Sequence, residues 1–524
     1  MSRAVIVGGG HNGLIAACYL ARAGLAVTVL EQADAAGGGS RTEETVPGFR
    51  FDTHSAAHNI INMTEIPAEL DLAAAGLTYR EMDPFAAGFL PDGRVVRFHR
   101  SVDATIASIA EHDAAEARRY GEFIERAMPA VEVATAGLTR ATSGPAVLRA
   151  GLARLGSARR AVRRAGGVGS LVQDVLAPYG GLLAQTLDTE LVRAPIAAFA
   201  AHGAVGPSAA GGGFFALWQA AYHRFGQWHA VGGAQALTDA LVTRLGSFGG
   251  RLRTGAAVRR IATGSSGVTG VELEDGERIA ADVVVTAMDP ATALLTLLDP
   301  PLSGPAGRRL AGVHRSNTVQ MVVHLATTAL PAYPGARAGD WNGLQSHVDS
   351  LDDLADAFRQ GEAGYLPDNV PTYAFTPSAI DDTLAPPGQH TVYLACPSAP
   401  FRVRGGWAAH GEAFADAMVE ALDKHAPGFA ASVVGRHVRT PELMAAELRW
   451  PGAHPMIIDI TPDQLSFLRP TPQLSGHRTP VPGLFVSGGG TAPTAGIAGV
   501  PGQAAALAVL RTQRGRRRGR RGEG

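Results

Sequence analysis

A short apolar run near the start of the chain breaks directly into glycines, and this feature restricts the fold more than any other. Residues 4–7 have the pattern of a buried strand, and Gly8, Gly10 and Gly13 follow in the spacing G-x-G-x-x-G. A helical pattern comes next, then a second apolar run that ends in Glu31. A chain with 65 glycines produces this spacing by chance, but the order strand, glycines, helix, strand and acid predicts a βαβ unit that binds a dinucleotide.

The three glycines have separate physical duties in such a unit. Gly8 lets the strand turn sharply into the helix, Gly10 allows backbone N–H groups to approach a pyrophosphate, and Gly13 lets the helix pack closely on the strand. The helix, over residues 14–23, directs the positive end of its dipole toward the phosphates. Glu31 is placed to accept hydrogen bonds from the ribose hydroxyls of the adenosine.

A second group of glycines, residues 37–39, follows Glu31 closely. FAD proteins of the glutathione-reductase type often carry a glycine pair here, represented in this chain by Gly38 and Gly39. Chains that use both FAD and NAD(P) usually show two complete G-x-G-x-x-G units, and we find one. Residues 483–490 form another apolar run that breaks into glycines, so the far end of the chain is expected to complete the same site. The sequence therefore predicts one dinucleotide, FAD.

Bulk composition limits the class of protein. The chain has 524 residues, too many for one compact core, and it is 46% hydrophobic and 18% charged with a formal net charge of −1. This balance predicts two domains and gives no bias toward nucleic acid. No apolar run reaches the roughly twenty residues that a membrane helix needs, and no signal-peptide pattern is found, so we expect a cytoplasmic protein.

The two cysteines, Cys18 and Cys396, form no C-x-x-C motif, which excludes flavin–disulfide chemistry. Neither belongs to a histidine pattern with metal-ligand spacing, so no metal site is expected. Cys18 lies inside the first predicted helix, where we expect a small packed side chain.

The strand and helix patterns divide the chain into discontinuous parts. The expected fold class is α/β, with a Rossmann-like FAD-binding domain of the glutathione-reductase type and a mixed α+β substrate domain. We expect the FAD-binding domain to comprise residues 1–75, 228–295 and 475–512. We expect the substrate domain to comprise residues 76–227 and 296–474. Residues 513–524 are rich in arginine and glycine and predict a disordered basic tail.

Four blocks of sequence occur in an order found in known flavoproteins. They are V-G-G-G-H-N-G-L-I-A-A at 7–17, P-G-F-R-F-D at 47–52, a central stretch at 231–237 and 253–261, and a C-terminal stretch at 463–470, 479–485 and 488–499. Together they resemble the phytoene desaturase-like flavoproteins, a group of carotenoid desaturases, carotene ketolases and carotenoid isomerases. The resemblance spans nearly the whole chain and is specific to a superfamily, not to one substrate.

The resemblance implies a set of residues that contact FAD. They are Gly8, Gly10, Gly13, Glu31, Gly38, Gly39, Val258, Gly489, Gly490, Thr491, Ile497, Gly499 and Val500. The backbone of Val258 would contact the adenine, and residues 489–491 would approach the pyrophosphate and the ribityl chain. Ile497, Gly499 and Val500 would lie along the isoalloxazine ring at the start of the last helix, whose dipole can stabilise negative charge on reduced flavin.

The chain departs from the family pattern at two places. Where relatives commonly carry G-x-G-T-H-P-G-G-G, residues 491–496 read T-A-P-T-A-G, so a histidine and two glycines are replaced. Many relatives also carry an arginine just after the early glycine pair, whereas Arg41 comes later here. These departures bear on the substrate more than on the flavin.

Two histidines, His54 and His58, are the candidates for acid–base chemistry. They follow the early glycines closely, so either could face the flavin or substrate and accept a proton. The alternative is that both are structural histidines bonded to backbone groups. A desaturase of this type needs few such groups, because hydride leaves an unactivated carbon for flavin N5 and the protein mainly orients the substrate and excludes water.

Two further segments bear on the substrate. Residues 149–164 predict a helix with six arginines, no acid and an apolar stripe. It is either a helix that rests on a membrane surface or a cap-domain helix with a solvated basic face. Six aromatic residues either line a substrate tunnel or belong to the core; they are Phe214, Phe215, Trp218, Tyr222, Phe225 and Trp228.

Together these features predict an FAD-dependent oxidoreductase that dehydrogenates or otherwise oxidises an apolar small molecule, such as a polyene, a terpenoid or another secondary metabolite. Because no NAD site is found, we expect reoxidation by oxygen or a quinone, and we expect peripheral contact with the inner face of a membrane. Three alternatives stay open: a redox-neutral polyene isomerase that uses reduced FAD, an amine-oxidase-type flavoenzyme, and a non-enzymatic escort protein of the same architecture.

Overall fold

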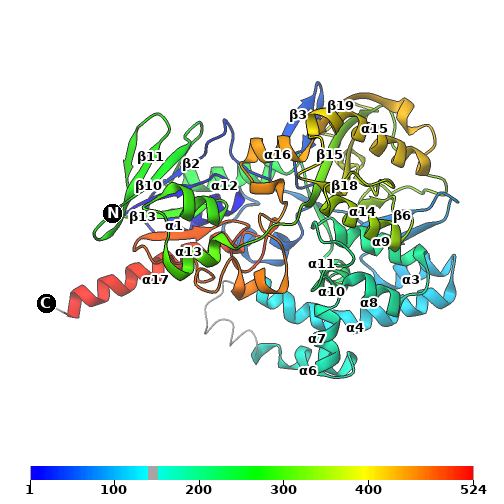
Figure 1. The fold of residues 1–524 in the computed structure, drawn as a ribbon, viewed down its shortest axis with the longest axis horizontal. Helices are drawn as coiled ribbons and strands as arrows, with labels where there is room; N and C mark the ends of the chain where they lie inside the picture. The colour runs from blue at the N-terminus through cyan, green and yellow to red at the C-terminus, as the bar shows by residue number, and fades with distance from the viewer. Residues whose placement is uncertain (1, 140–151, 523–524) are drawn as a thin grey trace.

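A five-stranded parallel sheet collects strands from the beginning, the middle and the end of the chain (Figure 1). The computed structural model describes residues 2–139 and 152–522. The strand order is β20-β13-β1-β2-β9, and every pairing is parallel. The strands are β1 (Arg3–Val7), β2 (Ala26–Leu30), β9 (Arg251–Arg253), β13 (Val283–Ala287) and β20 (Leu484–Ser487). The inner strands are short valine-rich runs, which is the pattern of parallel strands that are buried on both faces.

Two layers cover this sheet, and alternate residues of β1 point to each of them. Ala4 and Ile6 belong to the core formed with three helices, which are α1 (His11–Arg22), α12 (Gln235–Ser247) and α17 (Val500–Gly522). Val5 and Val7 belong to the core formed with a four-stranded sheet of order β12-β11-β10-β14. Its strands are β10 (Val258–Gly264), β11 (Gly267–Leu273), β12 (Arg278–Ala280) and β14 (Leu298–Asp299).

A seven-stranded sheet of order β19-β15-β18-β17-β16-β6-β7 forms the second part of the molecule. β16 pairs with β6 in parallel, and the other pairings are antiparallel. The strands are β6 (Ala86–Phe89), β7 (Val95–Phe98), β15 (Thr318–Thr327), β16 (Leu344–Ser346), β17 (Tyr373–Phe375), β18 (His390–Pro400) and β19 (Val433–Arg439). The long helix α15 (Trp407–His425) packs on one face of this sheet around Met321 and Leu394.

A layer of helices covers the other face. These helices are α3 (Val102–Ala110), α4 (Ala114–Leu138), α8 (Tyr179–Thr186), α9 (Glu190–Ala201), α10 (Gly213–Leu217), α11 (Gln219–Phe225) and α14 (Leu351–Glu362). Two more, α6 (Leu155–Arg164) and α7 (Val168–Leu176), project below α4 in Figure 1. The predicted arginine-rich helix over 149–164 begins outside the described residues, and α6 is its described part. No helix in the described ranges is long and apolar enough to cross a bilayer.

Two short ladders join the parts. The hairpin β3 (Thr42–Val46) and β4 (Phe49–Asp52) lies against the seven-stranded sheet, where Phe51 stacks on His324 with 4.6 Å between ring centroids. β5 (Tyr79–Glu81) pairs with β8 (Trp228–Ala230). This second ladder lies beside the expected domain boundaries at residues 75 and 227, which stay predictions.

The C-terminal segment differs from the expected disordered tail. α17 continues as a helix to Gly522, well past residue 512. Its first turns are anchored, because Ala505 and Val509 are buried in the core that α1 lines. Arginine, which dominates the following residues, is a good helix former and lets an anchored helix propagate outward. The structure thus describes a helix as far as Gly522, and the separate disordered tail at residues 513–524 stays a prediction.

Candidate active site

A cavity of about 400 Å³ lies at the carboxyl ends of the parallel strands. Gly8 follows β1, Glu31 follows β2, Ala287 ends β13 and Gly488 follows β20, and all four line it. Open parallel sheets bind ligands at this edge, and the volume falls in the range of roughly 300–1,000 Å³ that is usual for ligand pockets.

The three glycines of the first turn, Gly8, Gly10 and Gly13, differ in how much space a Cβ would have. Gly8 has φ +105°, and a Cβ at this position would stand 2.8 Å from the Ala287 carbonyl oxygen. A Cβ on Gly13 would stand 2.0 Å from the carbonyl oxygen of Gly8, so helix α1 could not approach the strand. Gly10 is different, because the nearest atoms to a Cβ there belong to Gly37 and Gly38, at 3.8 and 4.0 Å. Gly10 therefore keeps space open on the cavity wall, whereas Gly8 and Gly13 allow close packing.

The first turn of α1 offers backbone donors to the cavity. No side chain caps it and it contains no acidic residue. Free N–H groups at a helix N-terminus bind anions such as a pyrophosphate. The second glycine group joins this turn, because the Gly37 N–H donates to the Gly9 carbonyl at 3.0 Å. Gly38 and Gly39 line the cavity beside it.

The carboxylate of Glu31 is held by the backbone. Its Oε2 accepts the Gly9 N–H at 2.7 Å, and its Oε1 accepts the Ala33 N–H at 2.9 Å. A carboxylate has about four acceptor positions, so two remain for hydroxyl groups of a ligand. This arrangement is suited to a ribose.

The thirteen residues expected to contact FAD fall into two groups. Those that line the cavity are Gly8, Gly10, Glu31, Gly38, Gly39, Val258, Gly489 and Ile497. Those that lie behind its wall are Gly13, Gly490, Thr491, Gly499 and Val500. Thr491, for example, is fully buried and donates its hydroxyl hydrogen to the Gly488 carbonyl at 2.8 Å. Val500 packs in the core between α1 and α17.

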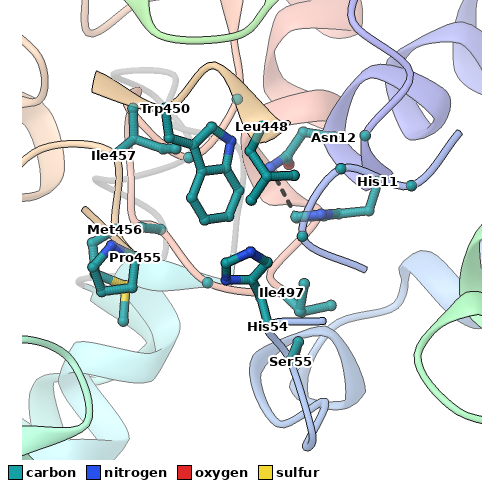
Figure 2. A pocket seen from close by; sticks show the side chains of 18 of the residues that line it. His11, Asn12, His54, Ser55, Leu448, Trp450, Pro455, Met456, Ile457 and Ile497 are labelled. Atoms are coloured by element: carbon teal, nitrogen blue, oxygen red, sulfur yellow. Dashed lines mark hydrogen bonds between the residues drawn. The ribbon is translucent and has the colours of Figure 1, made fainter. Parts of the chain in front are cut away.

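Only one of the two candidate histidines reaches the cavity. His54 lines it, its ring centroid lies 4.9 Å from that of Trp450, and its Nε2 is buried with no hydrogen-bond partner among the described residues (Figure 2). Burial, reinforced by the positive charges of Arg439 and Arg41, lowers the pKa of His54 to about 3. The ring is therefore neutral at pH 7 and is a weak base.

His58 lies away from the cavity. Its Nδ1 is 3.0 Å from the Tyr79 hydroxyl, and burial lowers its pKa to about 3. It connects the segment after β4 to the β5–β8 ladder, because its ring contacts Tyr79 of β5 and its backbone N–H donates to the Trp228 carbonyl of β8 at 2.8 Å. Its Nε2, like that of His54, is buried without a hydrogen-bond partner among the described residues, and its catalytic role stays a prediction.

An aromatic wall forms the other end of the cavity. Of the six aromatic residues singled out in the sequence, Phe214, Phe215, Trp218 and Tyr222 line it. Phe225 and Trp228 do not. Phe199 and Phe375 join this wall from α9 and β17. The cavity thus runs without interruption from the glycine turns to an apolar chamber.

A loop that sequence reasoning missed closes the cavity from above the histidine. It contributes Trp450, Pro455, Met456 and Ile457 (Figure 2). Ile460 of the same loop also lines the cavity. A Cβ on Gly39 would lie 2.7 Å from the Trp450 ring, so the indole rests directly on the second glycine group. Ile457 has φ +69°, a backbone state that β-branched residues rarely adopt. The one available signal was the block at 463–470 that resembles the family, which contains Arg469 and follows this loop.

These features fit a dinucleotide that carries a planar ring system. The glycine turns and the free helix N-terminus suit the pyrophosphate, Glu31 suits the ribose, and the space between His54 and Ile497 leads on to the aromatic wall. In the described ranges, no group of three His, Cys, Asp or Glu residues is positioned to hold a metal ion.

The sequence model of the family of flavin-containing amine oxidoreductases matches residues 13–395 of this chain. The chain belongs to this family. The mouse pyridine nucleotide-disulfide oxidoreductase domain-containing protein 2 is 31% identical over 94% of this chain and 90% of its own length. A phytoene desaturase (lycopene-forming) from a Paracoccus species is 25% identical over 94% of each chain. The second relative confirms the resemblance found in the sequence blocks.

A solved structure confirms the fold class. An oxidoreductase from Methanosarcina mazei superposes with a TM-score of 0.60 at 16% identity, over 97% of this chain and all of that one. At this identity the likeness concerns the fold alone. Together with the family match, it establishes an α/β flavoprotein whose cofactor is FAD and whose activity is that of an FAD-dependent oxidoreductase. The escort-protein alternative has no support from these relatives.

Proposed function

We propose that this flavoenzyme dehydrogenates an uncharged, apolar small molecule of the polyene or terpenoid class. The observation that carries the proposal is the continuity of one cavity, lined at one end by Gly8 and Glu31 and at the other by Phe214 and Phe215. Bound FAD supplies a hydride acceptor at N5. The chain supplies the binding site, the orientation of the substrate and the exclusion of water.

The residues proposed to hold FAD have different duties. Gly10 and the first turn of α1 would bind the pyrophosphate, Glu31 the ribose, and the Val258 backbone the adenine. Gly38, Gly39, Gly489 and Ile497 would lie along the ribityl chain and the ring. Gly13, Gly490, Thr491, Gly499 and Val500 would support these groups from behind.

Charge on the wall favours an uncharged substrate over an amine. Three of the described residues that line the cavity are acidic: Glu31, Asp289 and Glu447. Asp289 forms an ion pair with Arg315, Glu447 pairs with Arg439 at 2.6 Å, and Glu31 holds two backbone N–H groups. None of the three is free to neutralise an ammonium group, which would be costly to bury alone. The phytoene desaturase relative is in keeping with an apolar substrate.

His54 is the proposed proton acceptor. Its low pKa keeps the ring in the neutral form, the form that can take a proton, at every pH well above about 3. Asn59 and Gln227 also line the cavity, and each has a buried side-chain oxygen without a hydrogen-bond partner in the described chain. These two amides can orient a polar group of the substrate or an ordered water. We assign His58 to structural support.

The acceptor that reoxidises the flavin is proposed to be oxygen or a quinone, because we find one dinucleotide unit in the sequence. A redox-neutral isomerase stays the second candidate: the same cavity would hold a polyene, and activity would appear only after the flavin is reduced.

The test uses purified protein loaded with FAD under anaerobic conditions. Phytoene and limonene, delivered in cyclodextrin, are compared with putrescine and benzylamine. Hydrocarbons should bleach the visible flavin absorbance and yield a product with an added double bond, and amines should do neither. Bleaching by an amine, with peroxide release in air, would replace the proposal with amine oxidation. A shifted double bond formed only by prereduced protein would identify the isomerase.

A further inference from the structure

Two amide side chains in the wall of the cavity have oxygens without a partner. Asn59 and Gln227 both line the cavity, and the Asn59 Oδ1 and the Gln227 Oε1 are buried without a hydrogen-bond partner among the described residues. Gln227 is only 1% exposed. Most buried polar atoms in proteins are hydrogen-bonded, because an unpaired one destabilises the fold, so these oxygens point to a ligand. We call Asn59 and Gln227 the amide pair.

The backbone brings the two amides to the same part of the wall. The His58 N–H donates to the Trp228 carbonyl at 2.8 Å. Asn59 and Gln227 are the immediate sequence neighbours of these two residues, and each turns its side chain to the cavity. The amide pair therefore forms one local feature, although its members are 168 residues apart in the sequence.

The amide pair lies at the aromatic end of the cavity. Burial raises the pKa of Tyr222, and a hydrogen bond from the Asn59 side chain partly offsets this rise, so the amide lies beside the phenol. The amide nitrogen of Gln227 contacts the sulfur of Met82 at 3.7 Å, and Met82 packs in the same core as Tyr222. A group that binds here therefore belongs to the molecule in the aromatic chamber.

The same contacts determine which atoms of the two amides are free. A thioether sulfur only accepts hydrogen bonds, so Met82 takes an N–H of Gln227 and leaves the oxygen free. Asn59 acts as a donor toward the Tyr222 oxygen, because a donor favours the phenolate and opposes the rise in pKa. Both free atoms are acceptors, so the group that they bind must donate a hydrogen bond.

A hydroxyl group is the donor that suits this place. It is uncharged, and its hydrogen can bond to one amide oxygen or be shared between both. An ammonium group also donates, but its charge would be buried beside two neutral amides. The acidic side chains of the described wall are already engaged by arginines or by backbone N–H groups, so they leave such a charge unpaired.

The surroundings of the amide pair are mainly apolar. Ser55 and Gln320 also line the cavity, but they donate to the carbonyls of Ala57 and His202 and are satisfied as donors within the chain. The side chains that form this end of the cavity include Phe199, Phe214, Phe215, Trp218, Leu344 and Phe375. Ligand pockets of this kind use a few polar groups to orient an otherwise apolar molecule.

We propose that the amide pair binds a hydroxyl group of the substrate, and that the substrate is a terpenoid or polyene alcohol. The inference rests on the proposed function and narrows it, because it selects one kind of molecule within the class of uncharged, apolar substrates. A site that accepts a hydrogen bond from a hydroxyl discriminates against the parent hydrocarbon and the methyl ether, because both leave the amide oxygens unpaired.

Ligand binding to the FAD-loaded full chain tests the inference. The flavin is first reduced under anaerobic conditions, so that it cannot accept a hydride and binding is measured without dehydrogenation. Binding is followed by quenching of tryptophan fluorescence, since Trp218 and Trp450 line the cavity. Farnesol is compared, at equal free concentrations, with farnesyl methyl ether, whose oxygen only accepts, and with farnesene. In wild type, the Kd of farnesol should be lower than that of either analogue by about tenfold or more.

Variants of similar shape locate the preference. Gln227→Met and Asn59→Leu should each bring the Kd values of farnesol and its methyl ether close to equality. The matched control is Gln219→Met, because Gln219 is 2% exposed and has an unpartnered Nε2 in the described chain but does not line the cavity. This control should keep the wild-type preference. Unchanged flavin absorbance and melting temperature show that a variant is folded, and the three ligands on wild type decide the matter if one is not.

The outcomes separate this inference from the proposed function. Equal Kd values for farnesol and its methyl ether in wild type would overturn the inference, as would an unchanged preference in both amide variants or an equal loss in Gln219→Met. Tighter binding of farnesylamine than of farnesol would assign the amide pair to an ammonium group instead. A preference for farnesol in a protein whose flavin no terpenoid reduces would keep the hydroxyl recognition and reject the proposed function. Reduction of the flavin by farnesol and farnesene, without a difference in Kd, would do the reverse.

Discussion

The guanidinium of Arg469 donates two hydrogen bonds to the carbonyl oxygen of Gly489, 3.0 Å from Nε and 2.7 Å from Nη2. The same group donates to the carbonyls of Met456, Asp459 and Gln464. Arg469 is fully buried, so one side chain holds the loop above His54 against the glycine turn after β20. Its position links the substrate end of the cavity to the flavin end.

Replacement of Arg469 by methionine should lower the free energy of unfolding by at least about 3 kcal/mol, because several buried carbonyl groups lose their donor. Arg469→Lys should recover part of the loss, since an ammonium group has three donors. Urea denaturation followed by release of flavin fluorescence measures both. The control is Arg278→Met, whose side chain is 79% exposed and whose loss should change stability by less than about 0.5 kcal/mol. Equal stability of Arg469→Met and Arg278→Met would contradict the proposed role.

Two glycine-to-alanine variants should fail in different ways. A Cβ added in Gly10→Ala would clash with no protein atom, so the apoprotein should melt at the temperature of wild type. The same Cβ would stand where the pyrophosphate approaches, so FAD binding should be lost. Gly13→Ala places a Cβ 2.0 Å from the Gly8 carbonyl oxygen, so the apoprotein itself should be destabilised. Thermal melts of both apoproteins and fluorescence titration with FAD measure the two effects. A normal FAD affinity in Gly10→Ala would show that the pyrophosphate lies elsewhere.

Removal of the Glu31 carboxylate should weaken FAD without unfolding the protein. Each hydrogen bond from a ribose hydroxyl to this charged group contributes about 1.5–3 kcal/mol, so Glu31→Ala should raise the Kd for FAD roughly 10-fold to 100-fold. Glu277→Ala, an exposed glutamate that pairs with Arg253, provides the comparison and should leave the Kd unchanged. Titration of the apoproteins with FAD gives both values, and a Kd unaltered in Glu31→Ala would remove this residue from the site.

Alanine variants of the two histidines should differ, because one should lose activity and the other should lose stability. His54→Ala should lower kcat by roughly 100-fold while FAD stays bound, because the proposed proton acceptor is lost. His58→Ala should leave kcat largely intact and cost about 1 kcal/mol of stability, because the Tyr79 hydroxyl loses its partner. Steady-state kinetics and thermal melts are measured on the same preparations. The reverse result would place His58, not His54, in the reaction.

Stability should fall in mild acid through buried neutral histidines, and His477 provides a clean case. Its Nδ1 lies 3.0 Å from the Val486 carbonyl oxygen, its Nε2 is buried without a partner in the described chain, and burial lowers its pKa to about 4. The unfolded chain has the ordinary pKa of 6.5 and binds the proton first. The stability contributed by the neutral ring is therefore complete above pH 6.5 and is lost as the pH falls toward 4.

Between pH 7.5 and 5.5 this single histidine should cost about 1.4 kcal/mol. His477→Gln should lose that much less stability than wild type over the same interval, as measured by urea unfolding at both pH values. His410→Gln on α15 serves as the reference substitution. An identical pH dependence in wild type and His477→Gln would show that folding does not lower the pKa of this ring.

The sequence predicted the parallel strands and the glycine turns at the cavity, because local patterns determine structure there. Gly13 packs on the Gly8 carbonyl within one βαβ unit, and that unit formed as expected, whereas the close contact of Gly8 is with Ala287 of β13. The residues after β20 were placed at the same cavity because an apolar run that breaks into glycines has few structural interpretations. Family resemblance supplied Val258 and Ile497, which no local rule would have found.

The other parts of the site could not be predicted from the sequence, because their positions depend on tertiary packing. The loop that carries Trp450 and Ile457 has no periodic pattern, and its position is set by backbone carbonyls that meet Arg469. The choice between His54 and His58 depends on which side of one loop faces the cavity. The exposure of Val168, Val172 and Leu176 on α7 could not be predicted from the sequence alone, because their spacing would suit a buried helix face equally well.

The outermost strand of the parallel sheet has a consequence for biosynthesis. β20 pairs with β13, and the turn that follows it supplies Gly488 and Gly489. A nascent chain on the ribosome has already exposed β13 for almost two hundred residues before its partner emerges, and an unpaired strand edge is prone to aggregation. Cofactor loading must therefore come after translation of nearly the whole chain, and flavin-starved cells should accumulate a protein whose last strand frays first.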